Sequence, residues 1–136
     1  EGDLRYRSLT GEIIRFLGMR IEKAVAAGVA RENIIVDPGI GFGKRMEDNF
    51  TLIRHLRELK TLGRPIALGP SRKAFLGVST GVKVPAERVE GTAAAVTAAI
   101  MNGANILRVH DVRFMKRVSA TADALARDGN DLRHRD

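Results

Sequence analysis

The sequence predicts an α/β fold in which parallel strands alternate with helices, as on one side of a parallel α/β barrel. Three short apolar runs typical of strands each end at a cluster of polar or charged residues. Stretches with helical periodicity separate these runs, and helical crossovers connect parallel strands. Because the carboxyl ends of parallel strands meet at one rim, the three clusters should lie together where such barrels keep their catalytic residues.

The first predicted helix covers residues 10–27 and follows a polar loop at residues 1–9. Its apolar residues recur every three to four positions, which forms one face of a helix. Thr10 is the expected N-cap, because a hydroxyl there can accept a free backbone N–H. Gly28 is the expected C-cap, since glycine adopts the left-handed conformation that ends many helices.

The second unit begins with a β-branched run at residues 33–37, which Pro38-Gly39 stops and which therefore predicts a buried strand. A helix opens at residues 47–49, where two acidic residues suit the helix dipole. An apolar stripe continues this helix until Gly63 ends it. The next strand is predicted over residues 65–69.

The third unit begins with a longer loop at residues 77–85, rich in Gly, Ser, Thr and Val. A helix with an alanine-rich face follows at residues 86–102, and a glycine ends it. The third strand is predicted over residues 105–110. The last helix covers residues 112–126, and the charged tail at residues 127–136 is expected to be frayed.

Composition limits the class of protein. The 136 residues are enough for one domain, and 44% are hydrophobic, so a packed core is expected. The absence of cysteine excludes a disulfide scaffold and thiolate metal sites. No run of about 18 apolar residues predicts a membrane span. The net charge of +7 is spread along the chain with few aromatic residues, which favours attraction of a small anionic substrate over nucleic acid.

The number of strands predicts an incomplete structure. Three parallel strands do not close a barrel, which needs eight, and they leave one face of the sheet uncovered. The chain also begins with Glu rather than Met, and no signal-peptide pattern follows. We therefore expect residues 1–136 to form one partial barrel domain, whose other strands precede this chain or come from another chain.

The first polar cluster follows the strand at residues 33–37. Asp37 can accept two N–H groups from a guanidine-like edge, and the alternative is a cap on the glycine turn that follows. The loop at residues 39–44 matches neither the Walker A phosphate loop nor the dinucleotide-binding pattern. It is better interpreted as a loop whose backbone approaches a ligand closely, with Phe42 as a flat apolar wall.

The other two clusters are cationic. Lys73 follows the second strand and can donate to a carbonyl, an amide or an anion, although an isolated lysine is usually a solvated surface group. Arg108 and His110 are two residues apart in a strand, so both should face one side and form an anion site. The alternative is an internal ion pair for Arg108 and a neutral capping role for His110. Ser71 shows no base partner in the sequence, which disfavours a serine hydrolase.

Four segments within residues 10–125 together resemble the signature of dihydropteroate synthase in order and in spacing. They read Asp-Pro-Gly-Ile-Gly-Phe-Gly-Lys at 37–44, Gly-Pro-Ser-Arg-Lys-Ala-Phe-Leu-Gly at 69–77, Glu-Arg at 87–88 with Gly-Thr at 91–92, and Arg-Val-His-Asp-Val at 108–112. The resemblance implies a (β/α)8 TIM barrel of which this chain is the C-terminal part, with the last three strands and their helices.

The resemblance also implies a function. The family are transferases of folate biosynthesis, the targets of sulfonamides, and they join 6-hydroxymethyl-7,8-dihydropterin diphosphate to 4-aminobenzoate, releasing diphosphate. A cytoplasmic homodimer is implied, with residues 86–101 and 112–126 as candidate interface helices. Magnesium is implied as the metal, with its ligand in the missing N-terminal half and none in this chain. This chain alone is then expected to be inactive.

The resemblance assigns roles to individual residues. Asp37, Lys73 and Arg108 bind the pterin, and Arg108 with His110 binds the diphosphate. Lys73, Arg108 and His110 form the catalytic group. The 4-aminobenzoate pocket is bordered by Phe42, Ser71 and Lys73.

Two alternatives remain open. The chain could be the pterin-binding module of a corrinoid/tetrahydrofolate methyltransferase, which shares the barrel but has no diphosphate to bind. It could also be a non-catalytic half-barrel that pairs with a copy of itself or with a missing half. Affinity for the diphosphate group discriminates the synthase from the methyltransferase module.

Overall fold

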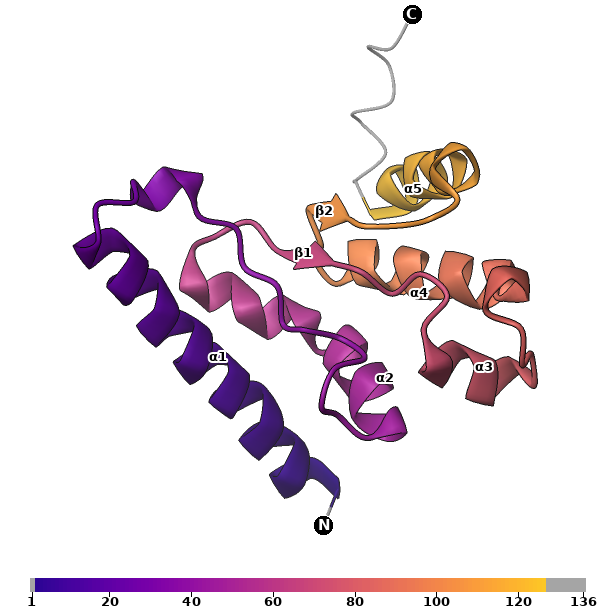
Figure 1. Cartoon of the computed structure of the whole chain (residues 1–136), viewed down its shortest axis with the longest axis horizontal. Helices are drawn as coiled ribbons and strands as arrows, with labels where there is room; N and C mark the ends of the chain where they lie inside the picture. The colour runs from indigo at the N-terminus through magenta and orange to yellow at the C-terminus, as the bar shows by residue number, and fades with distance from the viewer. Residues whose placement is uncertain (1, 127–136) are drawn as a thin grey trace, which may run out of the picture.

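The computed structural model describes residues 2–126, with side chains from residue 9 onward. Figure 1 shows two short strands at the centre of the molecule, with α1 and α5 toward opposite ends of the view. The elements follow in the order α1 (Gly2–Ala26), η1 (Arg31–Asn33), α2 (Met46–Arg54), η2 (Leu56–Leu62), β1 (Ala67–Leu68), α3 (Ala74–Thr80), η3 (Pro85–Glu87), α4 (Val89–Met101), β2 (Ile106–Leu107) and α5 (Val112–Ala126). The η elements are short 3-10 helices.

Three chain segments run in parallel beside one another, as predicted. β1 pairs with β2, and the register sets Leu68 opposite Leu107. A single parallel bridge joins Val36 to Ile66 on the other side of β1. The predicted strand at residues 33–37 is therefore reduced to one bridge, and the other two strands are shorter than predicted.

The helices cover one face of this sheet. Val36, Ile66 and Leu68 are buried against them in the main core, and a second cluster joins β2, α4 and α5. Ile35 and Ile106, which directly precede Val36 and Leu107 in the chain, are 53% and 40% exposed within the part of the chain that the structure describes. The sheet is therefore packed on one face and open on the other, which is the arrangement predicted for part of a barrel.

Two predictions about the helices are wrong. α1 begins at Gly2, so Thr10 lies inside the helix and cannot be its N-cap. The residues before Thr10 are polar but contain no proline, and polarity alone does not stop a helix. Much of the predicted loop at residues 77–85 is helical instead, because α3 extends to Thr80 and buries Phe75 edge-on against Phe50.

Other boundaries are confirmed. Gly28, Gly63 and Gly103 all have the left-handed conformation expected after a helix. The last helix has the predicted bounds, Val112–Ala126. The tail at residues 127–136 lies outside the described residues. No helix within residues 2–126 is both long and apolar enough to span a membrane.

Candidate functional site

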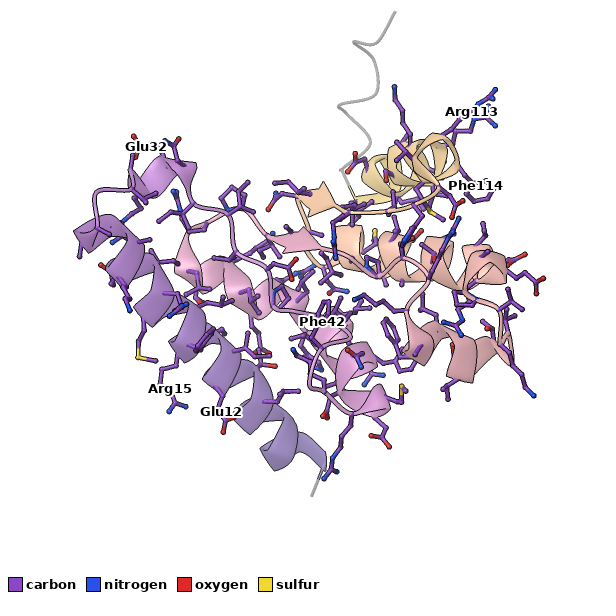
Figure 2. The ribbon with its side chains drawn as sticks, in the orientation of Figure 1. Glu12, Arg15, Glu32, Phe42, Arg113 and Phe114 are labelled. Atoms are coloured by element: carbon purple, nitrogen blue, oxygen red, sulfur yellow. The ribbon has the colours of Figure 1, made fainter. Side chains whose placement is uncertain are left out.

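A cleft of about 600 Å³ lies where the loops after β1 and β2 meet. It is lined by Gly69, Ser71, Arg72, Lys73, Pro85, Arg108, Val109 and His110. The structure thus brings together four of the six predicted site residues. The other two, Asp37 and Phe42, lie on the loop that leads into α2, where Figure 2 labels Phe42. Asp37 lines a separate hollow with Lys44 and α1.

The glycine-rich loop is held in shape by Asn49. Gly39, Gly41 and Gly43 all have positive φ, between 59° and 78°, which side chains disfavour. Asn49 is 2% exposed. It accepts the Gly41 N–H at Oδ1 (2.6 Å) and donates from Nδ2 to the Arg45 carbonyl (2.8 Å). Sequence reasoning placed Asn49 only at a helix start, and missed this role.

Replacing Asn49 with alanine is expected to lower the free energy of unfolding by about 2 kcal/mol, because it removes two hydrogen bonds of a buried side chain that contribute about 1 kcal/mol each. Urea denaturation measures this change. Asn102→Ala is the matched control, since Asn102, at the end of α4, makes a single side-chain hydrogen bond among the described residues, to the Ala98 carbonyl. The control should lose about 0.5 kcal/mol, and equal losses in both variants would contradict the assignment.

Asp37 and Lys44 close the two ends of this loop. Asp37 Oδ1 accepts the Gly39 N–H at 2.7 Å. One oxygen of this carboxylate therefore caps the glycine turn, which is the alternative role considered from the sequence. Lys44 Nζ donates to the Gly39 carbonyl (2.7 Å) and to the Phe42 carbonyl (3.2 Å). Burial lowers the pKa of Lys44 from its usual 10.5, and the negative charges of Asp37 and Asp48 oppose that shift.

Lys73 crosses from the loop after β1 to the glycine-rich loop. Its Nζ lies 3.8 Å from the centroid of the Phe42 ring, a cation–π contact. A Cβ on Gly41 would be 2.8 Å from Lys73 Cδ, closer than side chains pack. Glycine at position 41 is therefore what lets the lysine lie against this loop.

Arg108 is one of the residues that line the cleft. Among residues 9–126 no hydrogen bond or ion pair engages its guanidinium, so the internal ion pair considered from the sequence is not formed. The group lies against Gly69, where an added Cβ would be 3.2 Å from Arg108 Nε. Leu107 and Val109 pack into the cluster with α4 and α5, as the strand alternation predicts.

Ser71 pairs with His110, a contact that sequence reasoning missed. Ser71 Oγ accepts the His110 backbone N–H at 3.1 Å and lies 2.8 Å from His110 Nδ1. When the serine hydroxyl donates to Nδ1, the proton of the neutral ring is on Nε2. The strand register would have predicted this pair. Leu68 lies opposite Leu107, and Ser71 and His110 each follow three residues later.

The next pair continues the same register. Arg72 and Asp111 lie four residues beyond Leu68 and Leu107, and they form a two-point ion pair. The Nη2–Oδ1 distance is 2.9 Å and the Nε–Oδ2 distance is 3.3 Å. The two loops are thus joined side by side at the rim, and a cation-rich cleft of this kind suits an anionic ligand.

Comparison with known proteins finds a matching family and several similar relatives. A family described as pterin binding enzyme matches residues 1–110. Dihydropteroate synthase of Synechocystis sp. is 49% identical over 122 residues, which cover 90% of this chain and 42% of that protein. The Neisseria meningitidis serogroup B enzyme is 46% identical over 124 residues, covering 89% of this chain and 41% of its own length.

Solved structures that resemble this chain include dihydropteroate synthases. The chain is 40% identical to Yersinia pestis dihydropteroate synthase in complex with a sulfonamide drug, with a TM-score of 0.83 over 86% of this chain and 42% of that one. For the Thermus thermophilus enzyme in complex with 4-aminobenzoate, the identity is 42% and the TM-score 0.81, over 88% of this chain and 48% of that one. The chain spans less than half the length of these relatives.

Proposed function

This chain belongs to the pterin binding enzyme family, and we propose that it carries the C-terminal part of a dihydropteroate synthase, with the last three strands of a (β/α)8 barrel. The observation that carries the proposal is the shared cleft lined by Ser71, Lys73, Arg108 and His110. The open inner face of the sheet supports it, because the remaining strands of a barrel would cover that face.

The proposed reaction joins 4-aminobenzoate to 6-hydroxymethyl-7,8-dihydropterin diphosphate. The bond between the pterin methylene carbon and the diphosphate oxygen breaks, and diphosphate leaves with the electron pair. The amine nitrogen of 4-aminobenzoate forms the new bond to that carbon and then loses a proton. The electron-rich dihydropterin stabilises positive charge on the methylene as the leaving group departs.

Arg108 and His110 are proposed to bind the diphosphate and lower the barrier to its departure. The guanidinium of Arg108, which has no partner within the described residues, can form a fork with two phosphate oxygens. His110 can donate from Nε2 while Ser71 engages its Nδ1. Charge that develops on the leaving group is then met by donors already in position, which is a large source of rate enhancement in enzymes.

Lys73, Asp37 and Phe42 are proposed to bind the two rings. Lys73 lies between the cleft and the glycine-rich loop, so its ammonium can contact the pterin and face the second substrate. Asp37 uses Oδ1 for the Gly39 N–H, which leaves Oδ2 to accept an N–H of the pterin. Phe42 is 63% exposed and, with Ser71 and Lys73, borders the proposed 4-aminobenzoate pocket.

Magnesium is the metal proposed for the whole enzyme. Within the part that the structure describes, no three His, Cys, Asp or Glu side chains gather closely enough to hold a metal ion. We infer that its ligands lie in the N-terminal half of the enzyme.

The proposal extends to a homodimer that forms through α5. Phe114 and Leu125 are both exposed and lie three turns apart on the same side of this helix. Phe114→Glu should therefore lower the mass measured by light scattering for the whole enzyme. An unchanged mass would contradict an interface on this face.

The test uses a joined protein, in which this chain follows the N-terminal part of the Synechocystis sp. enzyme. Calorimetry compares a pterin diphosphate with the same pterin carrying a hydroxyl in place of the diphosphate. Tighter binding of the diphosphate, and its release when 4-aminobenzoate is added, would support the synthase. Equal binding without release would favour the methyltransferase-like module, and turnover by this chain alone would contradict an incomplete site.

Replacing Gly69 with alanine in the joined protein is expected to lower turnover about tenfold, because the new methyl group pushes the Arg108 guanidinium out of line. Steady-state kinetics measures this loss. The matched control is Gly18→Ala in α1, whose Cβ would meet Leu62 at an ordinary 3.7 Å. The control should keep full turnover, and unchanged turnover in Gly69→Ala would contradict the proposed role of Arg108.

A further inference from the structure

Arg72 has a backbone conformation that its neighbours must hold. Among residues 2–126 it is the one non-glycine residue with positive φ, at 60°. Such a conformation is strained for a side-chain-bearing residue and persists only where the surroundings hold it in place. Arg72 lies between Ser71 and Lys73, whose side chains contact His110 and Phe42 respectively.

Both backbone polar groups of Arg72 are held by α4 and the residue that precedes it. The Arg72 N–H donates to Thr92 Oγ1 (3.1 Å), and Arg88 Nη1 donates to the Arg72 carbonyl (2.9 Å). Thr92 is fully buried, and its hydroxyl donates in turn to the Arg88 carbonyl at 2.8 Å. The hydroxyl of Thr92 therefore accepts one hydrogen bond and donates another, which fixes its orientation.

Arg88 is itself fixed from several sides. Its Nε donates to the Val82 carbonyl (3.1 Å) and its Nη2 to the Lys83 carbonyl (2.6 Å). The guanidinium also crosses Gly77, where a Cβ would lie 2.6 Å from Arg88 Nε. This packing accounts for Arg88 and Thr92, which the family signature includes and to which sequence reasoning gave no role.

We propose that Arg88, Thr92 and Asp111 are positioning residues that hold Arg72 in its left-handed conformation. The left-handed turn at Arg72 sends its two neighbours in different directions, Ser71 toward His110 and Lys73 toward the glycine-rich loop. Asp111 holds the side chain of Arg72 while the other two hold its backbone. The inference rests on the proposed synthase function, because it concerns how the catalytic groups of that reaction are aimed.

The first test removes the Thr92 hydroxyl in the joined protein. Thr92→Val is expected to lower kcat about tenfold with less than about a twofold change in either KM, since misaimed groups act on the reacting centre. Thr97→Val is the matched control, because Thr97 on the same helix donates to the Ala93 carbonyl and makes no other side-chain hydrogen bond within residues 9–126. The control should keep kcat, and equal losses in both variants would overturn the proposal.

A second test repeats Thr92→Val in variants of Arg72. It distinguishes whether Thr92 holds the strained backbone of Arg72 or only accepts its N–H. Arg72→Gly keeps that N–H but adopts positive φ without strain, and Arg72→Asn also tolerates it. In either background, Thr92→Val should cost less than about a twofold loss in kcat. A tenfold loss in every background would overturn the proposal, because Thr92 would then do no more than satisfy a donor.

A spectroscopic measurement keeps this inference separable from the proposed function. The ring nitrogen NMR shifts of His110 in the joined protein report whether Nδ1 accepts a hydrogen bond. Thr92→Val should change these shifts while Thr97→Val leaves them unchanged. If the unsubstituted joined protein has no synthase activity, the proposed function fails, and the shifts still decide the role of Thr92: unchanged shifts in Thr92→Val would overturn it.

Discussion

Arg108→Ala in the joined protein is expected to lower turnover roughly a thousandfold, because it removes the guanidinium that is proposed to bind the diphosphate leaving group. The side chain is exposed and unpaired within residues 9–126, so its loss should change the free energy of unfolding by less than about 0.5 kcal/mol. Product formation and urea denaturation measure the two quantities separately.

Arg108→Lys is the informative companion variant. Lysine keeps the positive charge but lacks the planar fork that binds two oxygens at once. Turnover should therefore fall between that of the parent and that of the alanine variant. If Arg108→Ala kept turnover within about threefold of the parent, the assignment of the diphosphate to this residue would be wrong.

Lys73→Met is expected to lower turnover about a hundredfold, because it removes the ammonium that faces both proposed substrates. Methionine is of similar length and stays unbranched, so packing against Gly41 is retained. The lost cation–π contact with Phe42 should cost about 0.5 to 1 kcal/mol of stability. Kinetics at saturating substrate, with thermal unfolding alongside, measures both effects.

Lys83→Met supplies the control for a change of charge alone. Lys83 is an exposed lysine in the loop before η3, and it contributes its carbonyl to Arg88. Its side chain should be replaceable without loss of turnover. A similar loss in Lys83→Met and Lys73→Met would indicate a general effect of net charge and would contradict a specific role for Lys73.

The two residues of the proposed anion-binding site show what local sequence can predict. Alternation along the third strand predicts that Arg108 and His110 share a side, and the structure has both at the same cleft. The partner of His110 was not predicted, because Ser71 is 39 residues away and shows no local pattern that links them. That partner follows only when the register of β1 against β2 is known.

The helix ends show a similar division. Gly28, Gly63 and Gly103 end their elements where the sequence predicts, because left-handed glycine is a local property of the backbone. The predicted N-cap at Thr10 is wrong, because a residue that is favoured at a helix cap is also tolerated inside a helix. The helical segment at Ala74–Thr80 was missed since its formation depends on burying Phe75 against Phe50, a contact between separate helices.

The sequence by itself determined the alternation of the longer helices with three parallel segments, and the polar residues at the ends of those segments, since each follows from periodicity and chain breaks within a few residues. Only the tertiary structure decided which of those residues touch. Arg72 has a left-handed conformation, its backbone is held by Arg88 and Thr92, and its side chain pairs with Asp111. These contacts join three separate segments of the chain. Such contacts depend on the register and packing of segments far apart in the chain, and no local pattern encodes them.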